Sequence, residues 1–357
     1  MKLLGFDLEI LLSVMILSII SLVMIWSLES SLFFTQATFI IIGFLAFLLF
    51  SRLDFRIFEN LTTPFYVISI VLLFLTFFVG EVTRGSMRWL DFGFFNLQPS
   101  EVVKPFLVMF FASQLAKELK WGFKRVIKIS LLAILPLLFI FKQPDLGSTL
   151  VLLASFTGIV FSSRIPKSYL LIGFLIIIFL TPVGWVLLES YQKSRIISFL
   201  NPYSDPLGTG YHVIQSVITV GSGGFLGRGL GMGTQSHLSF LPEHHTDFIF
   251  ASLAEELGFL GAMMVITSYF VLLFRILNIA HKSDSLFGSL IGFGIFSQLL
   301  FQVFVNIGMN IGIMPITGIT LPLVSYGGSS FVSIMISLGL VESITKSKKL
   351  ETAIEIR

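Results

Sequence analysis

A glutamate and a lysine lie three residues apart in an otherwise apolar stretch of the sequence. Glu101 and Lys104 share one face of a helix that begins near Pro99, a residue suited to the first helical turn. An ionisable group in a spanning helix costs about 2.5–3.5 kcal/mol at the bilayer centre, and less near the interface. The pair either locks the helix as a structural ion pair or forms the charged wall of an outward-facing cavity, and we favour the cavity wall.

A further acidic position, Asp247, opens a long apolar run. Thr246 and Asp247 precede this run as helix N-cap residues do, and the positive end of the helix would keep a carboxylate ionised there. The run over 247–277 would be about 46 Å long, whereas the hydrocarbon core is about 30 Å thick. Its first turns must therefore project outside, tilt strongly or line a polar cavity. The adjacent Glu255 and Glu256 fit either a polar cavity or buried hydrogen bonding, and we favour buried hydrogen bonding.

A glycine-rich segment, GSGGFLGRGLGMG at 221–233, has seven glycines in 13 positions. It either presents successive backbone N–H groups and Arg228 to a phosphate, or it serves only to turn tightly. It is not a nucleotide-binding loop, because no Gly-Lys-Ser/Thr follows it. The nearby histidines lack the spacing of a zinc site, so a hard divalent cation on Asp247, completed by lipid phosphates, is favoured over zinc.

The overall composition indicates which elements must position these groups. Of 357 residues, 55% are hydrophobic and 12% are charged, whereas a soluble chain carries about 25% charged residues. The mean hydropathy is +0.94. These values exclude a cytosolic enzyme and a nucleic-acid-binding module. The absence of cysteine excludes a disulfide scaffold, thiolate metal sites and cysteine nucleophiles.

The hydropathy pattern predicts an all-α integral membrane protein with about ten transmembrane helices of about 20 residues each. We expect a single polytopic membrane domain over 1–357, within which 189–246 forms one large extracytoplasmic loop. The expected spans are roughly 8–27, 32–50, 63–80, 99–116, 126–141, 146–163, 168–188, 247–277, 285–312 and 319–344.

The positions of Lys and Arg predict that both termini are cytoplasmic. With the N-terminus inside, 16 of these residues fall in cytoplasmic segments and six in external segments. Each external cation either anchors a loop at the headgroup level or binds phosphate. These cations lie in the same loops as the unusual features above, and this shared location favours phosphate binding. The six are Arg84, Arg88, Lys142, Lys193, Arg195 and Arg228.

The last hydrophobic stretch is interrupted by prolines and glycines from Pro315 to Gly328. Non-helical backbone at membrane depth is tolerated only where it is buried in protein or lines a cavity. Asn306 and Asn310 lie on the preceding helix. We therefore expect a polar-lined, irregular floor here in place of a lipid-facing surface.

The sequence resembles the SEDS family (shape, elongation, division and sporulation proteins) over nearly its whole length. The run NIGMNIGIMPITGITLPLVSYGGSS at 306–330 fits the family's C-terminal signature. Four further blocks match in the expected order: GSMRWLDFGFFNLQPSEVVK, KQPDLGSTL, NPYSDPLGTGYHVIQSVITVGSGG and FLPEHHTDFIFA. Within the family, QPDLG, GYHVIQS and GTQSHLSFLPE are more similar to the rod-shape branch, RodA, than to the division branch, FtsW.

The resemblance implies a ten-helix peptidoglycan glycosyltransferase of the bacterial cytoplasmic membrane, serving cell-wall elongation and rod shape. It would join lipid II into glycan strands at the outer face of the membrane and release undecaprenyl diphosphate. The implied partners are lipid II, the nascent lipid-linked glycan, a class B penicillin-binding protein that crosslinks the strands, and other elongation-complex membrane proteins. No nucleic acid is expected.

The resemblance also implies roles for single residues. The family's essential aspartate falls on Asp247 and its charged pair on Glu101 and Lys104, so these three are the expected catalytic residues. Asp247 would act as the base or would hold a divalent cation, Mg²⁺ or Mn²⁺. Cations would neutralise the leaving pyrophosphate, and Glu101 would position Lys104. The expected substrate-binding residues are Arg84, Arg88, Trp89, Gln98, Asp145, Arg195, Arg228 and Ser325.

Other readings compete with the polymerase. A lipid II flippase would place its charges near the midplane and show repeated halves, whereas the charges here gather at the external end. A scaffold that only activates a penicillin-binding partner would not need Glu101, Lys104 and Asp247 to converge. A division-type paralogue would share the chemistry and differ in its place in the cell.

Overall fold

The computed structural model describes residues 2–3, 6–83, 86–91, 93, 96–117, 121–238 and 240–355, so Arg84 lies outside the described part. Two short strands at the N-terminus, β1 (Lys2–Leu3) and β2 (Phe6–Asp7), pair antiparallel. The helices of the first half are α1 (Leu8–Leu28), α2 (Phe33–Arg52), α3 (Thr62–Val79), α4 (Pro99–Val102), α5 (Lys104–Ala116), α6 (Phe123–Lys142) and α7 (Leu146–Ser162). Those of the second half are α8 (Lys167–Leu187), α9 (Ser190–Leu200), α10 (Tyr211–Ser222), α11 (Thr234–His237), α12 (Ile249–His281), α13 (Leu286–Asn310) and α14 (Gly328–Glu355).

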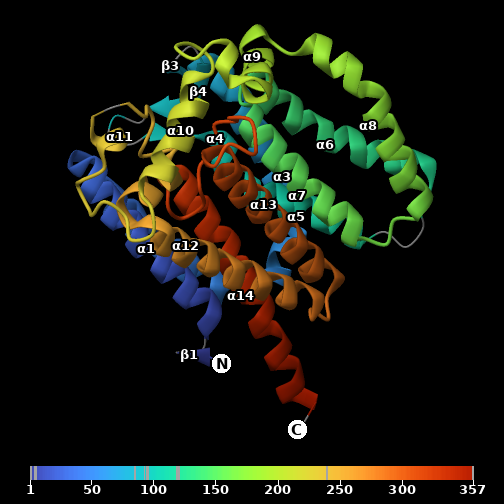
Figure 1. The fold of residues 1–357 in the computed structure, drawn as a ribbon. Helices are drawn as coiled ribbons and strands as arrows, with labels where there is room; N and C mark the ends of the chain where they lie inside the picture. The colour runs from blue at the N-terminus through green and yellow to red at the C-terminus, as the bar shows by residue number, and fades with distance from the viewer. Residues whose placement is uncertain are drawn as a thin grey trace.

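The long helices form a bundle whose two termini lie at the same end (Figure 1). Helix α14 packs against α2, α13 packs against α7, α12 and α5, and α1 packs against α12. The α14 span is 89% buried, whereas none of the described side chains of the α8 span is buried. Helix α14 is therefore the centre of the bundle, and α8 runs along its outer side.

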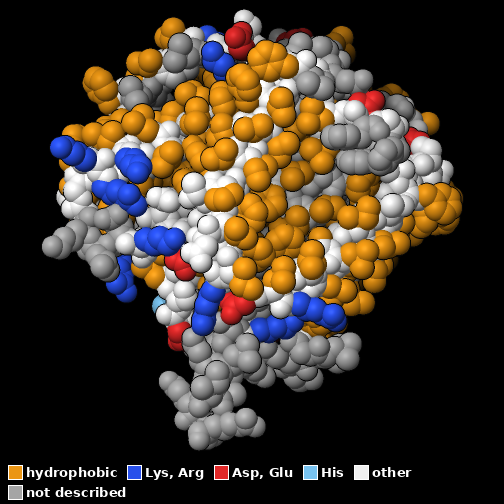
Figure 2. Space-filling view, turned by 180° about the vertical axis from the view of Figure 1, so that it is seen from behind, with side chains coloured by type: hydrophobic (Ala, Val, Ile, Leu, Met, Phe, Trp, Pro, Cys, Tyr) orange, Lys and Arg blue, Asp and Glu red, His pale blue; other side chains and the backbone are white. Residues whose placement is uncertain are grey.

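The surface carries the signature of a membrane protein. Among the residues that the structure describes, six helical segments are long and apolar enough to cross a membrane, and the helices over 62–78 and 146–162 are shorter apolar segments. Figure 2 shows hydrophobic side chains filling the middle of one face, with most Lys and Arg side chains at its left and lower margins. Exposed side chains such as Phe34 and Phe179, at 79% and 80%, have no explanation in a water-soluble fold.

The ten expected spans coincide with long helical segments, with two differences. The last helix begins at Gly328 and not near 319, because Pro315 and Pro322 lack a backbone donor and Gly318 has φ +75°. The fourth span is divided into α4 and α5 at Val103. The connection predicted as one external loop, 189–246, itself contains α9, α10, α11 and the short 3₁₀ helix Pro202–Ser204.

A small antiparallel sheet lies between α3 and α4, at the end of the bundle opposite the termini (Figure 1). Its strands are β3 (Glu81–Thr83), β4 (Ser86–Asp91) and β5 (Asn96–Leu97), in that order. Leu90 pairs with Leu97, and Asp91 with Asn96. Arg88 and Trp89 lie on β4 of this sheet, and its last strand ends directly before Gln98 and α4.

Candidate functional site

Glu101 and Lys104 form an ion pair inside the bundle. Lys104 Nζ lies 2.6 Å from Glu101 Oε1, and the two residues are 1% and 6% exposed. Ser148 Oγ on α7 donates to the same carboxylate at 3.3 Å. Pro105 cannot donate to the Glu101 carbonyl as a helical residue would, and Ser333 Oγ on α14 donates to it at 2.7 Å. The charged pair thus lies on α4 and α5 and is held by contacts from α7 and α14.

Asp145 joins this pair at the start of α7. Its carboxylate caps the helix by accepting from Ser148 N at 3.0 Å. Gln98 Nε2 and Ser100 Oγ donate to its other oxygen at 3.1 and 3.3 Å. Asp145 is 5% exposed. Ser148 therefore contacts both carboxylates, a link that the cap spacing Asp-x-x-Ser could have indicated but that sequence analysis missed.

Arg88 and Tyr191 meet at the turn before Asp145. Arg88 Nε donates to the Gln143 carbonyl at 2.9 Å, and Arg88 Nη2 donates to the Pro144 carbonyl. Tyr191 on α9 donates to the same Pro144 carbonyl at 3.2 Å. These contacts attach β4 and α9 to the start of α7. Tyr191 was not anticipated from the sequence, and no motif marks it.

Arg195 and Asp247 come together at Gly318. The Arg195 guanidinium lies 5.8 Å from the centre of the Tyr191 ring, as a cation–π pair. A Cβ placed on Gly318 would lie 3.6 Å from Asp247 Oδ2 and 3.8 Å from Arg195 Nη1. Gly318, with φ +75°, thus lets a carboxylate and a guanidinium approach the same point of the backbone.

The irregular 311–327 segment connects these two groups of side chains. A Cβ on Gly147, two residues after Asp145, would lie 3.0 Å from the Thr317 carbonyl and 2.9 Å from Ile319. The start of α7 therefore packs against one side of this segment, whereas Asp247 and Arg195 lie at Gly318. We call the two side chains at Gly318, together with the charged groups linked to them through the start of α7, the Gly318 junction: Arg195, Asp247, Asp145, Glu101 and Lys104.

Ser325 belongs to the support of this junction. Its hydroxyl donates to the Thr246 carbonyl at 2.6 Å and accepts from Leu321 N at 2.8 Å. Trp89 follows Arg88 on β4, so its side chain points to the opposite face of that strand. The structure thus brings Asp145 and Arg195 to the expected catalytic residues, and places Arg88 and Gln98 beside Asp145.

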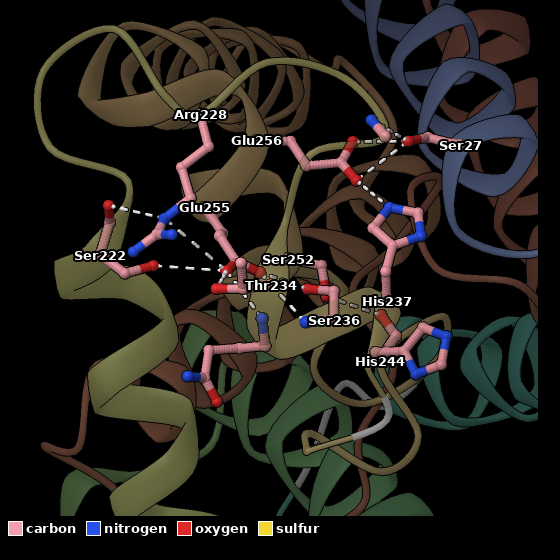
Figure 3. Close-up of polar contacts among 12 residues, drawn as sticks. Ser27, Ser222, Arg228, Thr234, Ser236, His237, His244, Ser252, Glu255 and Glu256 are labelled. Atoms are coloured by element: carbon pink, nitrogen blue, oxygen red, sulfur yellow. Dashed lines mark hydrogen bonds and ion pairs between the residues drawn. The ribbon is translucent and has the colours of Figure 1, made fainter.

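Glu255 and Glu256 lie in a separate cluster near the N-terminal end of α12 (Figure 3). They are 0% and 1% exposed. Glu255 accepts from Gln235 N at 2.9 Å and from Ser236 N and Oγ at 3.1 and 2.8 Å. Glu256 accepts from Ser27 Oγ at 2.7 Å and contacts His237 Nε2 at 2.7 Å. The expectation of buried hydrogen bonding for this pair is confirmed.

The glycine-rich segment completes a break in α12. Gly258 has φ +66°, a non-helical conformation inside this helix. The N–H groups of Phe259 and Leu260 donate to the Gly224 and Phe225 carbonyls at 3.0 and 3.3 Å. Those of Arg228 and Gly229 donate to the Glu255 and Glu256 carbonyls at 2.9 and 3.0 Å. Of the two alternatives for this segment, the structure therefore shows a tight turn whose N–H groups at 228 and 229 bind the protein itself.

Arg228 lies in the Glu255 cluster. Its Nε donates to the Ser222 carbonyl at 3.3 Å and lies 4.0 Å from Glu255 Oε1. Its side chain is 40% exposed, so it can still reach a ligand outside the cluster.

His212 on α10 lies near the Gly318 junction. Its ring centre is 6.4 Å from that of Phe248, the residue after Asp247. Burial lowers the pKa of His212, the positive charge of Arg195 lowers it further, and Glu243 acts in the opposite direction. His212 is therefore held neutral at pH values where an exposed histidine would begin to charge.

The carboxylates of the junction do not form an all-protein metal cage. Asp145 and Glu101 accept hydrogen bonds or an ion pair from named side chains. Within the described part of the chain, no three His, Cys, Asp or Glu side chains are grouped to hold a metal. Asp247 supplies one carboxylate, which fits a Mg²⁺-type ion that is otherwise bound by water and substrate phosphates.

Comparison with known proteins gives concordant matches. Residues 3–350 match the sequence model of the FtsW, RodA and SpoVE proteins, described as cell cycle proteins. The chain is 38% identical over 313 residues to the peptidoglycan glycosyltransferase MrdB of Escherichia coli K12, covering 87% of this chain and 85% of MrdB. It is 36% identical over 357 residues to the stage V sporulation protein E of Bacillus subtilis 168, covering 95% and 97%.

Two solved structures share the fold. A chain from a peptidoglycan synthase complex, in a structure that concerns the coordination of polymerization and crosslinking, superposes with a TM-score of 0.83 at 32% identity. The match covers 97% of this chain and 99% of that chain. The rod shape determining protein RodA of Thermus thermophilus superposes with a TM-score of 0.74 at 28% identity, over 96% of this chain and 98% of RodA.

Proposed function

The chain belongs to the SEDS family of FtsW, RodA and SpoVE and is a membrane-embedded peptidoglycan glycosyltransferase, and from this premise we propose that it polymerises lipid II at the Gly318 junction. The observation that carries the proposal is the approach of Asp247 and Arg195 to one point of the backbone. The buried Glu101–Lys104 pair is hydrogen-bonded to Ser148 at the start of α7, which packs against the same segment. A carboxylate beside cations suits the transfer of a glycosyl group from a pyrophosphate.

The reaction assigns a distinct task to Asp247. The hydroxyl oxygen of one lipid II forms a bond to the anomeric carbon of the lipid-linked strand, and the bond from that carbon to the pyrophosphate oxygen breaks. Asp247 takes the hydroxyl proton as the bond forms. The helix α12 that follows keeps this carboxylate ionised through the positive end of its dipole.

The cations of the site have the complementary task. Arg195 at the junction and Lys104 behind it would stabilise the negative charge that develops on the departing pyrophosphate. Arg88, Trp89, Gln98 and Asp145 would bind the sugar and phosphate groups near α7, with Ser325 holding the backbone beneath them. Arg84 and Arg228 are proposed to engage the substrate at the external rim.

A divalent ion, Mg²⁺ or Mn²⁺, is proposed to bind between Asp247 and the substrate phosphates, where it would add positive charge for the leaving group. The working partner is proposed to be a class B penicillin-binding protein, within an elongation complex of membrane proteins. The peptidoglycan synthase complex to which this chain is similar supports that choice. We further propose that the site faces outward from the bacterial cytoplasmic membrane, with both termini inside.

The proposal is tested by glycan-strand synthesis from lipid II with purified protein, with and without Mn²⁺ or Mg²⁺, alone and with a class B partner. Wild type should form polymer and folded Asp247→Asn should not, because the amide cannot accept the proton. Full activity in Asp247→Asn would refute the base assignment. A lipid II translocation assay with the same protein reconstituted in liposomes distinguishes the polymerase from a flippase. Binding of the class B partner without polymer formation would identify a scaffold.

A further inference from the structure

The start of α12 is tied to α13 through Asp247. In the first turn of α12, the N–H of Ala251 has no carbonyl partner within the helix, because the first intrahelical bond runs from Ser252 N to the carbonyl of the N-cap residue Phe248, at 3.1 Å. Ala251 N donates to Asn310 Oδ1 at 3.0 Å. Asn310 Nδ2 in turn donates to the Asp247 carbonyl at 3.1 Å. One side-chain amide from α13 therefore bridges the first turn of α12 and the residue that precedes its N-cap.

A second amide from the same helix fixes the Asp247 carbonyl from another side. Asn306 Nδ2 donates to the Asp247 carbonyl at 3.0 Å and to the Ile319 carbonyl at 2.7 Å. Ile319 follows Gly318, where Asp247 Oδ2 and Arg195 Nη1 come together. Asn306 thus ties the backbone of the proposed base to the backbone of the junction.

Both amides are themselves fixed in place. Asn306 and Asn310 are 0% exposed. Asn310 Nδ2 also donates to the Asn306 carbonyl at 2.8 Å, and Ser216 Oγ on α10 donates to the Asn310 carbonyl at 2.8 Å. A buried side-chain amide costs free energy unless its N–H groups and its oxygen form hydrogen bonds. The Asn310 side chain therefore cannot change its rotamer without losing several hydrogen bonds.

We propose that Asn310 and Asn306 are positioning residues that hold Asp247 just before helix α12 and aim its carboxylate at the Gly318 junction. If the Asn310 amide is removed, Ala251 N can bond directly to the Asp247 carbonyl. Helix α12 is then extended by one residue toward Asp247, and the Asp247 side chain turns with its backbone. This inference rests on the proposed function only in the consequence it predicts for catalysis.

The first test measures the direction of the side chain at 247 without measuring activity. The chain contains no cysteine, so Asp247→Cys introduces a single thiol. Because the thiol lies beside the positive charge of Arg195, it should react faster with an anionic methanethiosulfonate than with a cationic one. The expected rate ratio is about fivefold if the dielectric constant is that of water. Adding Asn310→Ala should reduce this rate ratio toward one. An unchanged ratio would overturn the positioning proposal whatever the activity.

The second test measures catalysis in the otherwise wild-type protein. Asn310→Ala should lower kcat for glycan synthesis by about 100-fold, the effect of a base displaced by about 1 Å, with KM for lipid II nearly unchanged. Asn310→Asp retains the acceptor for Ala251 N and the side-chain volume but replaces the donor, so it should lose kcat similarly while still folding. Wild-type kcat in both variants would overturn the proposal.

The matched control is Gln298→Leu on the same helix. Gln298 is also a buried amide, at 1% exposed, but neither of its polar side-chain atoms has a hydrogen-bond partner. Its loss should leave both the labelling ratio and kcat unchanged, and a loss as large as that of Asn310→Ala would overturn the specific role of Asn310. Full activity of Asp247→Asn would refute the base assignment, and the labelling ratio would still decide the positioning.

Discussion

Replacing Lys104 by methionine separates a structural ion pair from a catalytic one. Methionine keeps most of the apolar stem of lysine and removes the ammonium group. Lys104 is 1% exposed, and its Nζ lies 2.6 Å from Glu101 Oε1. The substitution therefore leaves the Glu101 carboxylate, itself 6% exposed, without this cation in a desolvated place.

The size of the effect follows from this burial. Removing one partner of a buried pair costs about 3–5 kcal/mol, because the remaining charge is uncompensated. We expect the lower end, about 3 kcal/mol, since Ser148 Oγ still donates to the Glu101 carboxylate. Glu101→Gln combined with Lys104→Met removes both charges and should recover most of this loss.

The assay pairs stability with activity for each variant. Detergent-solubilised proteins are compared by their midpoint of denaturation and by glycan synthesis from lipid II. Lys104→Met should be destabilised and inactive, whereas the double variant should be stable and still inactive, because under the proposed function it lacks the ammonium that stabilises the departing pyrophosphate. Lys117→Met is the matched control, since Lys117 lies 3.8 Å from Glu59 and is 50% exposed. Removing that surface pair should cost no more than about 1 kcal/mol.

Two results would refute the reasoning. If the double variant recovered activity together with stability, the pair would only lock the helix and would not act on the substrate. If Lys104→Met were as stable as Lys117→Met, the burial argument itself would fail.

Two further predictions concern the break in α12 and the histidine near the junction. Gly258→Ala should destabilise the protein by at least about 2 kcal/mol, because its Cβ would lie 2.2 Å from Gly227 N at a φ of +66°; a denaturation midpoint equal to that of Gly221→Ala, whose Cβ would have no atom of the described residues within 4 Å, would contradict this. His212 has a lowered pKa through burial and the charge of Arg195, so the stability it contributes is fully present above its ordinary pKa of about 6.5 and is lost as the pH falls through its folded pKa. His212→Gln should therefore flatten the decline of the denaturation midpoint between about pH 7 and 5, and parallel curves for the two proteins would show that His212 does not titrate as described.

Local pattern was sufficient to predict most of the helices. The apolar runs are long, and residues such as Asp145 and Pro99 mark helix starts through their own chemistry. That Asp145 and Arg195 belong to the same site as the expected catalytic residues was predicted only from the family resemblance. The sequence pattern alone did not give the contact between the start of α7 and the 317–319 backbone, since that contact joins segments far apart in the chain.

The glycine-rich segment shows why the remainder could not be predicted. Its composition allows both a phosphate nest and a tight turn, since each needs backbone without Cβ atoms. The tight turn forms because Gly258 breaks α12 and leaves N–H and carbonyl groups of that helix without helical partners. The glycine-rich segment then binds these groups. A single glycine in a long apolar run does not identify such a break, so the partner of the segment becomes visible only in three dimensions.

The three carboxylates on or beside the start of α12 differ in what satisfies them. Glu255 accepts hydrogen bonds from the N–H groups of Gln235 and Ser236, so its charge holds backbone. Glu256 contacts the Ser27 hydroxyl of α1 and the His237 ring. At Asp247 the backbone is held by other side chains: Asn306 and Asn310 bind its carbonyl, and Ser325 binds that of Thr246. The Asp247 carboxylate itself lies at Gly318 beside Arg195. A membrane site can present a reactive carboxylate beside irregular backbone only if other polar groups satisfy that backbone, and this requirement explains why asparagines and serines surround Asp247.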